Sequence, residues 1–510
     1  MLDLSKLNVV FEMANNHQGD VDHALHIVHE VSKLVEKYAV DGVIKWQFRH
    51  LPTFVRDDID PETNSHVGRF ESTALMMNDF ELLFAECRHR NLKVMVTPFD
   101  EISVDHAIDL GVDFLKVASC SAEDWPLLEK IKQAGKPVIF STGGLGLDAV
   151  RKLVSFFTHA DLPWIAMMHC VSLYPMASED SGLDLMDLYS REFPGLPIGW
   201  STHENPDDFI PAVVAASKGC MLFEKHIGSA GSKGYALNRY SLEVTEAGDW
   251  IGAILAAKKA CDVSDFNLVR EKEVPELEKL QRTSICKYAK KKGDLITPDD
   301  CEFRFPLGEG EVPPSVFSSH NKVTATEDIA PGDVLTNHMI SIEKKNSYFL
   351  SEVIRRYKAL LNLSNTSLPQ DFVLEISHHE GIEKAHQVGA ALITIVNDDY
   401  CKKVLIMLPG QFHPSHHHPI KSETFFVVWG DLRVQLNGES YELIPGSLLK
   451  VPSGALHSFT TVNGCVFEEI STKALVGDSK YQESNISAKR LEDRKSWFKG
   501  WGRFQLDAID

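Results

Sequence analysis

The first 265 residues alternate between short apolar, β-branched runs and longer amphipathic stretches, and this alternation restricts the fold more than any other feature of the chain. Short apolar runs are typical of buried parallel strands, and apolar residues three and four apart are typical of covering helices. Eight such runs occur, at residues 8–13, 42–48, 93–97, 113–117, 137–141, 164–169, 196–201 and 220–224. Eight strand-helix units predict a closed (β/α)8 TIM barrel over residues 1–270 rather than an open doubly wound sheet.

Polar residues stand at the end of nearly every predicted strand. In a parallel barrel these ends meet at one mouth, where such barrels hold their active sites, and burying so many polar groups elsewhere would be costly. The strand-end residues include two lysines, several hydroxyls and the Ser141-Thr142-Gly143 turn, which together suit a phosphate dianion. They are Glu12, Lys45, Gln47, Thr97, Lys116, Ser119, Ser141, Cys170, Tyr174, Ser201 and Glu224.

Two histidines, His203 and His226, follow the last two predicted strands. Neighbouring strand ends lie side by side, so the two imidazoles could share one divalent ion, with Glu12 as a further candidate ligand. The alternative is that both histidines only form hydrogen bonds at the strand ends.

Composition excludes several classes of protein. A chain of 510 residues is too long for one core, and its formal charge of −20 argues against nucleic-acid binding, which needs clustered Lys and Arg. No run of 18 or more apolar residues and no signal peptide is present, which predicts a cytoplasmic protein without a membrane segment. The nine cysteines include no CxxC pair, so we expect reduced thiols and not a disulfide or zinc framework.

The segments FEMANNHQG, IKWQ, TPFD, LKVAS, STGG, HCVSLYP, GWSTHE and EKHI closely resemble the sialic acid synthase family, over about residues 8–333. The resemblance implies condensation of phosphoenolpyruvate with an open-chain acylamino hexose, giving a nine-carbon 2-keto-3-deoxy sugar acid and phosphate. It implies that His203 and His226 bind Mn2+ or Mg2+. Phosphoenolpyruvate would be held by Lys45, Thr97, Lys116, Ser119, Ser141, Ser201 and Ser172, the last replacing a frequent asparagine. Glu12, Gln47 and Tyr174 would line the reaction centre, and Glu12 would stabilise positive charge at C2 or take a proton from the attacking water.

Two departures from the family pattern fall on the acceptor side. The family's Gly-Glu after the fourth strand is here Cys120-Ser121, and its Gly-Pro-Asp-His is here Tyr235-Ala236-Leu237-Asn238. The acceptor is therefore open: an N-acetylmannosamine-like sugar, the acceptor of another 2-keto-3-deoxy sugar acid, or a phosphorylated sugar. The sequence alone shows too few further basic residues to identify a second phosphate site. A non-catalytic sugar-binding protein is the alternative outside enzymes.

The middle of the chain resembles the small antifreeze-like (SAF) domain that follows the barrel in this family. Residues 271–345 contain two similar Gly-Asp turns, at Gly293 and Gly332. In the family this domain caps the partner's barrel with an arginine, for which Arg304 is the nearest match, so the resemblance implies a domain-swapped homodimer. A surface arginine is the alternative. Residues 346–370 are predicted to form an amphipathic helix and a linker.

Short alternating apolar runs from residue 371 onward predict an all-β barrel or jelly roll, with a terminal helix over 488–510 carrying Trp497 and Trp501. Alternate residues of a strand share a face, so His416 and His418 point inward, where Glu423 and His457 complete a cup for Mn2+, Zn2+ or Fe2+. This spacing resembles both motifs of the cupin family. Lys421 is placed as in cupin-type sugar isomerases, so two roles stay open: an isomerase or epimerase, or a sugar-binding or stabilising module.

Overall fold

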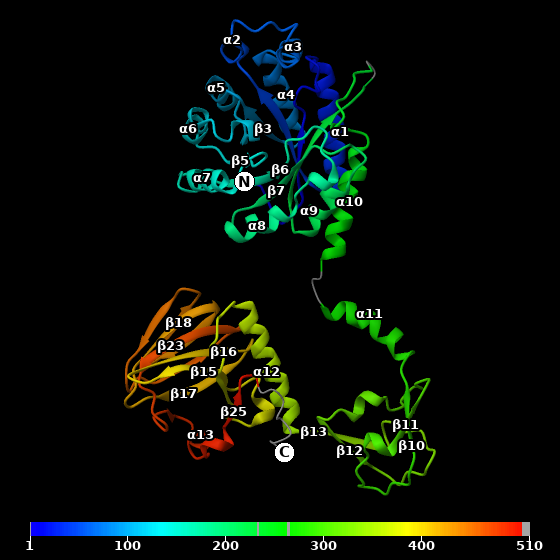
Figure 1. The fold of residues 1–510 in the computed structure, drawn as a ribbon, viewed down its shortest axis with the longest axis vertical. Helices are drawn as coiled ribbons and strands as arrows, with labels where there is room; N and C mark the ends of the chain where they lie inside the picture. The colour runs from blue at the N-terminus through cyan, green and yellow to red at the C-terminus, as the bar shows by residue number, and fades with distance from the viewer. Residues whose placement is uncertain (1, 232–233, 263–265, 502–510) are drawn as a thin grey trace. The chain divides into compact units, whose positions relative to one another are not determined.

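The computed structural model describes residues 2–231, 234–262 and 266–501, and the chain divides into two compact units, Met1–Phe266 and Asn267–Asp510 (Figure 1). In the first unit eight parallel strands follow one another in chain order, and β8 pairs with β1 to close the sheet. The predicted TIM-type barrel is therefore confirmed. Its strands are β1 Asn8–Glu12, β2 Asp41–Phe48, β3 Lys93–Pro98, β4 Phe114–Val117, β5 Val138–Ser141, β6 Ile165–Cys170, β7 Ile198–Thr202 and β8 Leu222–Gly228. A short strand β9, Leu242–Glu243, pairs in parallel with the end of β8.

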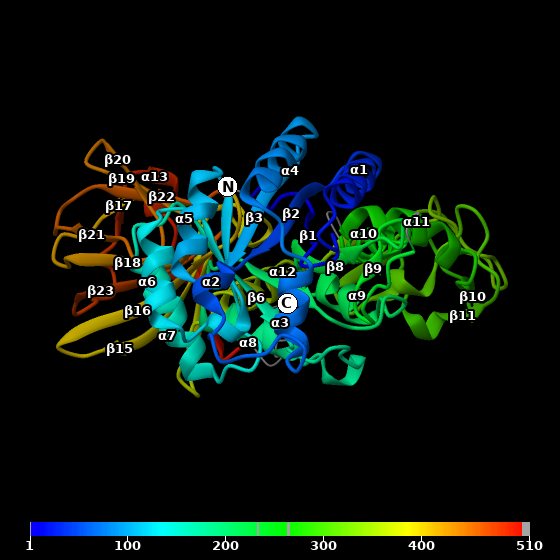
Figure 2. The same ribbon diagram turned by 90° about the horizontal axis from the view of Figure 1, so that it is seen from above.

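Helices cover the outside of the barrel, as the view from above shows (Figure 2). The first of them begins where the Asp20 side chain accepts a hydrogen bond from the His23 amide, and it ends at Ala39 in the left-handed conformation. The connection between β2 and β3 is longer than the others and carries three helices. The helices are α1 Val21–Tyr38, α2 Leu51–Phe54, α3 Ser65–Ser72, α4 Met77–His89, α5 Glu101–Asp109, α6 Trp125–Gln133, α7 Leu147–Thr158, α8 Asp184–Glu192, α9 Ile210–Ser217 and α10 Ala247–Cys261.

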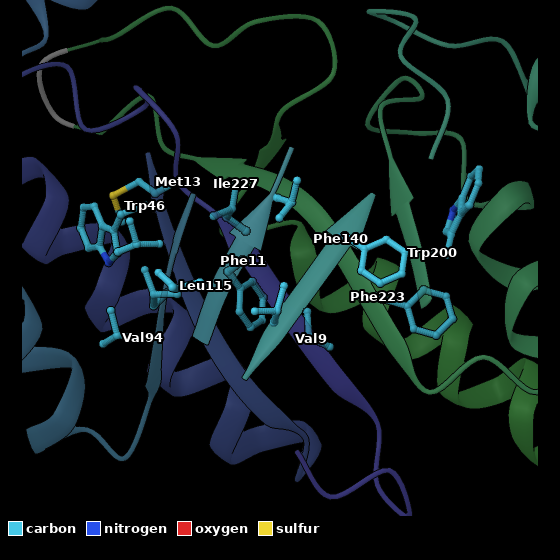
Figure 3. Close-up of a cluster of buried hydrophobic side chains, with 14 of the residues drawn as sticks. Val9, Phe11, Met13, Trp46, Val94, Leu115, Phe140, Trp200, Phe223 and Ile227 are labelled. Carbon is cyan, nitrogen blue, oxygen red and sulfur yellow. The ribbon is translucent and has the colours of Figure 1, made fainter. Parts of the chain in front are cut away.

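The barrel has two apolar layers because side chains alternate along each strand. On β1, Val9 and Phe11 belong to the large cluster that packs between strands and helices (Figure 3). Val10 belongs instead to a smaller cluster with Val43 and Met95 of the neighbouring strands. The smaller cluster fills the barrel interior, so the polar residues at the strand ends lie above a closed apolar base.

The second unit begins with α11, Phe266–Glu278, followed by two small antiparallel ladders. The ladders are β10 Thr283–Cys286 with β11 Cys301–Arg304, and β12 Asn321–Ala325 with β13 Ile340–Lys344. They share one apolar cluster that includes Val312 and Leu335. The division of this unit into parts at 271–345, 346–370 and 371–510 stays a prediction.

Two antiparallel sheets form the rest of the second unit, with strand orders β21-β18-β23-β16-β15-β14-β25 and β20-β19-β22-β17-β24. The amphipathic helix α12, Asn346–Leu363, packs its apolar face on β14 to β16 and on β23. The strands are β14 Val373–Ser377, β15 Ala390–Asn397, β16 Tyr400–Met407, β17 Phe412–His417, β18 Glu423–Gly430, β19 Leu432–Leu436, β20 Glu439–Leu443, β21 Leu448–Val451, β22 His457–Thr460, β23 Cys465–Thr472, β24 Lys480–Tyr481 and β25 Lys495–Lys499.

The terminal helix predicted over 488–510 is wrong in its central part. Lys495–Lys499 form β25, which pairs antiparallel with β14 at the edge of the larger sheet. Trp497 Nε1 donates a hydrogen bond to Glu375 Oε2 at 3.1 Å, so the indole lies across the neighbouring strand. The open edge of β14 offers unpaired backbone groups, and pairing with them favours an extended conformation of this segment over a helix. Residues 502–510 lie outside the described part, and none of the described helices is long and apolar enough to cross a membrane.

Candidate active site

A layer of polar side chains lies directly above the apolar base of the barrel. Seven of its eight members lie two residues beyond an apolar residue of the base, and Ser201 lies two residues beyond Gly199, so the period of a strand places all eight on the same inner face. The layer consists of Glu12, Lys45, Thr97, Lys116, Ser141, Cys170, Ser201 and Glu224, one residue from each strand. All eight line one cavity of about 520 Å³, together with the predicted residues Gln47, Ser119, Ser172, Tyr174, His203 and His226. The structure thus brings together every predicted site residue of the barrel.

Lys45 lies between two buried carboxylates. Its Nζ contacts the Glu12 carboxylate and lies 2.7 Å from Glu224 Oε1. Burial alone would raise the pKa of Glu224, but Lys116 and Lys45 outweigh it and hold that pKa far below its ordinary value. Burial raises the pKa of Glu12, which Lys45 offsets only in part. The two carboxyls therefore differ: Glu224 is a fixed anion, and Glu12 is suited to proton transfer.

The predicted phosphate seat is formed at β4 and β5. Lys116 Nζ lies 2.5 Å from Ser141 Oγ, and the Gly143 amide donates to Ser119 Oγ at 3.0 Å. A Cβ on Gly143 would lie 2.4 Å from Ser172 Oγ and 2.7 Å from Ser119 Oγ, so a larger residue here would displace these two hydroxyls. The seat therefore supplies one ammonium and several hydroxyl donors to an anion.

His203 and His226 face each other with ring centroids 5.3 Å apart. The His203 Nδ1 forms a hydrogen bond with the Val171 carbonyl at 2.9 Å, which leaves Nε2 as the ligand atom. The Nδ1 of His226 is buried and makes no hydrogen bond. Burial lowers the pKa of His203 to about 4 and that of His226 well below its ordinary value, so both rings are neutral near pH 7, the form that binds metals.

This donor set fits one divalent ion with several open positions, as in catalytic metal sites. Glu12, the further candidate ligand, is bound by Lys45 and accepts a hydrogen bond from the Ala14 amide at 2.8 Å. Within residues 2–231, 234–262 and 266–501, no third His, Cys, Asp or Glu completes a ligand group with the two histidines. Among the His, Cys, Asp and Glu residues of the described part, His203 and His226 are the candidate ligands of an ion here.

Sequence reasoning missed several residues of this cavity. Arg49, Arg69 and Tyr240 line it, and so does Asn238, which the sequence indicated only as a departure from the family pattern. Arg49 lies two residues beyond Gln47 and so continues the inner face of β2, which is a signal the sequence contained. Arg69 lies on α3, and nothing in the sequence indicates that this helix reaches the mouth.

Arg304 is not part of the geometry just described. It ends β11 in the second unit, where its exposed guanidinium forms an ion pair with Glu302. Its role as an acceptor ligand stays a prediction.

The predicted cupin residues form a second candidate metal site. His416, His418 and His457 each contribute one imidazole nitrogen to a group in which the three nitrogens lie within 4.8 Å of one another. All three side chains are buried. The Nδ1 atoms of His416 and His457 each form a hydrogen bond with a backbone carbonyl at 3.0 Å, which directs Nε2 inward. Glu423 Oε2 lies 3.3 Å from His457 Nε2, and neither atom makes a hydrogen bond. These residues fit a three-nitrogen, one-carboxylate ion site.

Lys421 lies beside this site and is held by two carboxylates. Its Nζ contacts Glu423 and lies 2.8 Å from Glu469 Oε1. Burial alone would lower the pKa of Lys421, but the two carboxylates outweigh it and raise that pKa above its ordinary value. A lysine in this state carries its proton near pH 7 and is a poor general base.

Comparison with known proteins agrees with both halves of this description. The model of the NeuB family matches residues 35–265, and that of the cupin domain matches residues 403–465. The crystal structure of the putative spore coat polysaccharide biosynthesis protein E from Chromobacterium violaceum is 33% identical, with a TM-score of 0.60. The match covers 66% of this chain and 100% of that one.

Two curated relatives carry different names. The N-acetylneuraminate-9-phosphate synthase of Drosophila melanogaster is 29% identical over 47% of this chain and 64% of its own length. The N,N'-diacetyllegionaminic acid synthase of Legionella pneumophila is 27% identical over 43% of this chain and 63% of its own. The match thus spans less than two thirds of either relative. Because the family model matches most of the barrel and the bacterial structure is 33% identical over its whole length, the chain is a member of the NeuB family that also carries a cupin domain.

Proposed function

We propose that the barrel condenses phosphoenolpyruvate with an acylamino hexose to give a nine-carbon 2-keto-3-deoxy sugar acid and phosphate. The observation that carries this proposal is the single polar layer in which Lys45 and Lys116 lie beside the neutral pair His203 and His226. A divalent ion held by the histidines would polarise the aldehyde oxygen of the acceptor.

The chain's own residues account for the other steps. Lys116, Ser141 and Ser119 bind the phosphate group and keep it in place while C3 of phosphoenolpyruvate forms a bond to the aldehyde carbon. Positive charge then develops at C2, which the fixed anion Glu224 stabilises. Water adds to C2, Glu12 accepts one of its protons and passes it to the oxygen of the former aldehyde, and the C2 hydroxyl gives its proton to the departing phosphate as the C–O bond breaks. Phosphoenolpyruvate, aldehyde and one water thus give one sugar acid and one phosphate.

The relatives support a sialic-acid-type acceptor but differ in their names. The fly relative is named for a 9-phosphate product, and the Legionella relative is named for an N,N'-diacetylated one. Gln47 and Tyr174 would contact the acceptor in either case. Another 2-keto-3-deoxy sugar acid as product is the alternative among enzymes, and a non-catalytic sugar-binding protein is the alternative outside them.

Phosphate release from phosphoenolpyruvate with Mn2+ tests the proposal. The acceptor panel contains N-acetylmannosamine, its 6-phosphate and di-N-acetylated hexoses, and mass spectrometry identifies the product. Phosphate release that requires one of the sugars, together with a product that contains three more carbons than that sugar, supports the synthase. If metal-loaded protein releases no phosphate with any sugar of the panel, the sugar-binding alternative is favoured.

For the cupin we favour a sugar-binding or stabilising role over an isomerase, because the ion-paired Lys421 lacks the free base that proton transfer between C1 and C2 needs. Conversion of a ketose or epimer to an aldose by the full chain, lost in His416→Ala, would instead support the isomerase.

We also retain the domain-swapped homodimer, in which Arg304 would cap the partner's barrel. Light scattering tests the dimer, and a raised acceptor KM in Arg304→Ala tests the cap.

A further inference from the structure

The mouth cavity contains two arginines that the proposed reaction does not yet use. Arg49 follows β2 and Arg69 lies on α3, and both line the cavity that holds the predicted acceptor residue Gln47. The Nη2 of Arg49 donates a hydrogen bond to Gln47 Oε1 at 3.0 Å, so Arg49 is directly linked to the acceptor side.

Arg49 is held between two aromatic rings. Its guanidinium carbon lies 3.7 Å from the ring centre of Phe99 and 4.1 Å from that of Phe70. Stacking of this kind fixes the guanidinium plane and leaves its edge donors available. One of these donors, Nε, is buried and makes no hydrogen bond. A fixed guanidinium edge with an unused donor matches the geometry of an oxyanion.

Neither arginine has a carboxylate partner within the described residues. None of the ion pairs found there includes Arg49 or Arg69, although Asp100 and Glu12 both attract Arg49 electrostatically. Glu12 is bound by Lys45, and the Asp100 carboxylate accepts hydrogen bonds from Ser103 and from the His50 amide. Both carboxylates are therefore bound by other groups.

The charge balance of the polar layer also leaves the two arginines without a counter-ion among the described residues. Lys45 and Lys116 are matched by Glu12 and Glu224. The two arginines are the further cations of the cavity, and Arg69 repels Arg49. Like charges that share a cavity without a counter-ion are stabilised when an anion binds between them.

We propose that Arg49 and Arg69 form an anion subsite of the acceptor and hold a phosphate monoester carried by the acceptor sugar. This inference rests on the proposed function and names the substrate class within it: the acceptor is a phosphorylated acylamino hexose. Two guanidinium groups suit a phosphate, which offers three oxygens, better than a single carboxylate.

The test compares N-acetylmannosamine with its 6-phosphate as acceptor, with Mn2+ and phosphoenolpyruvate held constant. The wild type should show a kcat/KM about 100-fold higher for the 6-phosphate, as expected for charge-assisted contacts to one phosphate. Arg49→Met and Arg69→Met should each remove most of this preference by raising the KM for the 6-phosphate, with the KM for phosphoenolpyruvate unchanged. Arg56→Met is the matched control, because Arg56 is exposed and paired with Asp58.

Several results would overturn the inference while leaving the synthase intact. One is an equal or better kcat/KM for the neutral sugar, with both variants unchanged. Another is a raised KM for phosphoenolpyruvate, which would assign the arginines to the donor seat. A preference for 2-acetamido-2-deoxymannuronic acid would make the anion a carboxylate. If no sugar reacts, the proposed function fails. Titration calorimetry with N-acetylmannosamine 6-phosphate then tests the anion subsite by itself: weaker binding to Arg49→Met than to the wild type supports the subsite, and equal binding overturns it.

Discussion

Lys45 on β2 and Glu224 on β8 form a buried ion pair across the intervening strand β1, with 2.7 Å between Nζ and Oε1. The same carboxylate oxygen accepts a hydrogen bond from Ser201 at 2.9 Å and lies 3.8 Å from Lys116 Nζ. One carboxylate therefore orients both lysines that are proposed to bind phosphoenolpyruvate. Buried charges are tolerated only when paired, so Glu224 positions the lysines and also permits their burial.

Replacement of this carboxylate should affect turnover and stability together. In Glu224→Gln we expect kcat to decrease at least 100-fold, because the positive charge at C2 loses its fixed anion, and the unfolding free energy to decrease by about 3 kcal/mol. Glu204→Gln is the control, since Glu204 pairs with Lys225 at 3.3 Å, is equally buried and does not line the cavity. It should lose similar stability but keep its kcat at a temperature where it is folded. Equal kcat in both variants would contradict the role of Glu224.

Lys116 should determine the affinity for phosphoenolpyruvate. Lys116→Ala removes the buried ammonium of the phosphate seat, so the apparent KM for phosphoenolpyruvate should increase by about 100-fold, while the KM for the acceptor changes little. Ser141→Ala removes only a neutral partner, and about a tenfold increase is expected. Steady-state kinetics with each substrate varied in turn measures both effects. Unchanged kinetics in Lys116→Ala would remove this lysine from the seat.

The barrel and most of its site were predictable because both depend on strand period. Lys45, Lys116 and His226 were found as polar residues at the ends of the predicted strands, and the period of a strand then places Lys45 and Lys116 on the inner face, two residues beyond Val43 and Phe114. Glu224 was noticed at a strand end, but its contacts with both lysines depend on the pairing of β7, β8 and β1, which single strands do not specify.

Other features could not be predicted because they depend on tertiary packing. Arg69 lies on α3 in the long connection after β2, and its place in the cavity depends on how this connection packs at the mouth of the barrel. The edge strand β25 lies within the tail that was predicted as a terminal helix carrying Trp497 and Trp501. The free edge of β14 determined the outcome.

Removal of metal should separate the two candidate ion sites. The wild type should bind two divalent ions per chain, and His203→Ala and His416→Ala should each bind one, as measured by elemental analysis after Mn2+ loading. Phosphate release should be lost in His203→Ala and after EDTA treatment, but it should persist in His416→Ala, because His416 belongs to the cupin site. Loss of phosphate release in folded His416→Ala would show that the barrel reaction depends on the cupin.

The buried histidine pair should bind metal at a lower pH than exposed histidines do. Protons compete with metal for imidazole, and His203 has a pKa of about 4, with that of His226 also well below 6.5. The neutral form of both rings therefore persists as the pH falls, until the pH approaches 4. At pH 5.5 an ordinary pair would lose about 100-fold in affinity, roughly tenfold per ring, whereas this pair should lose less than about twofold. Electron paramagnetic resonance of free Mn2+ in His416→Ala, where the barrel site is isolated, measures this difference. A steep loss of binding between pH 7 and 5.5, with circular dichroism unchanged, would contradict the burial of the pair as the cause.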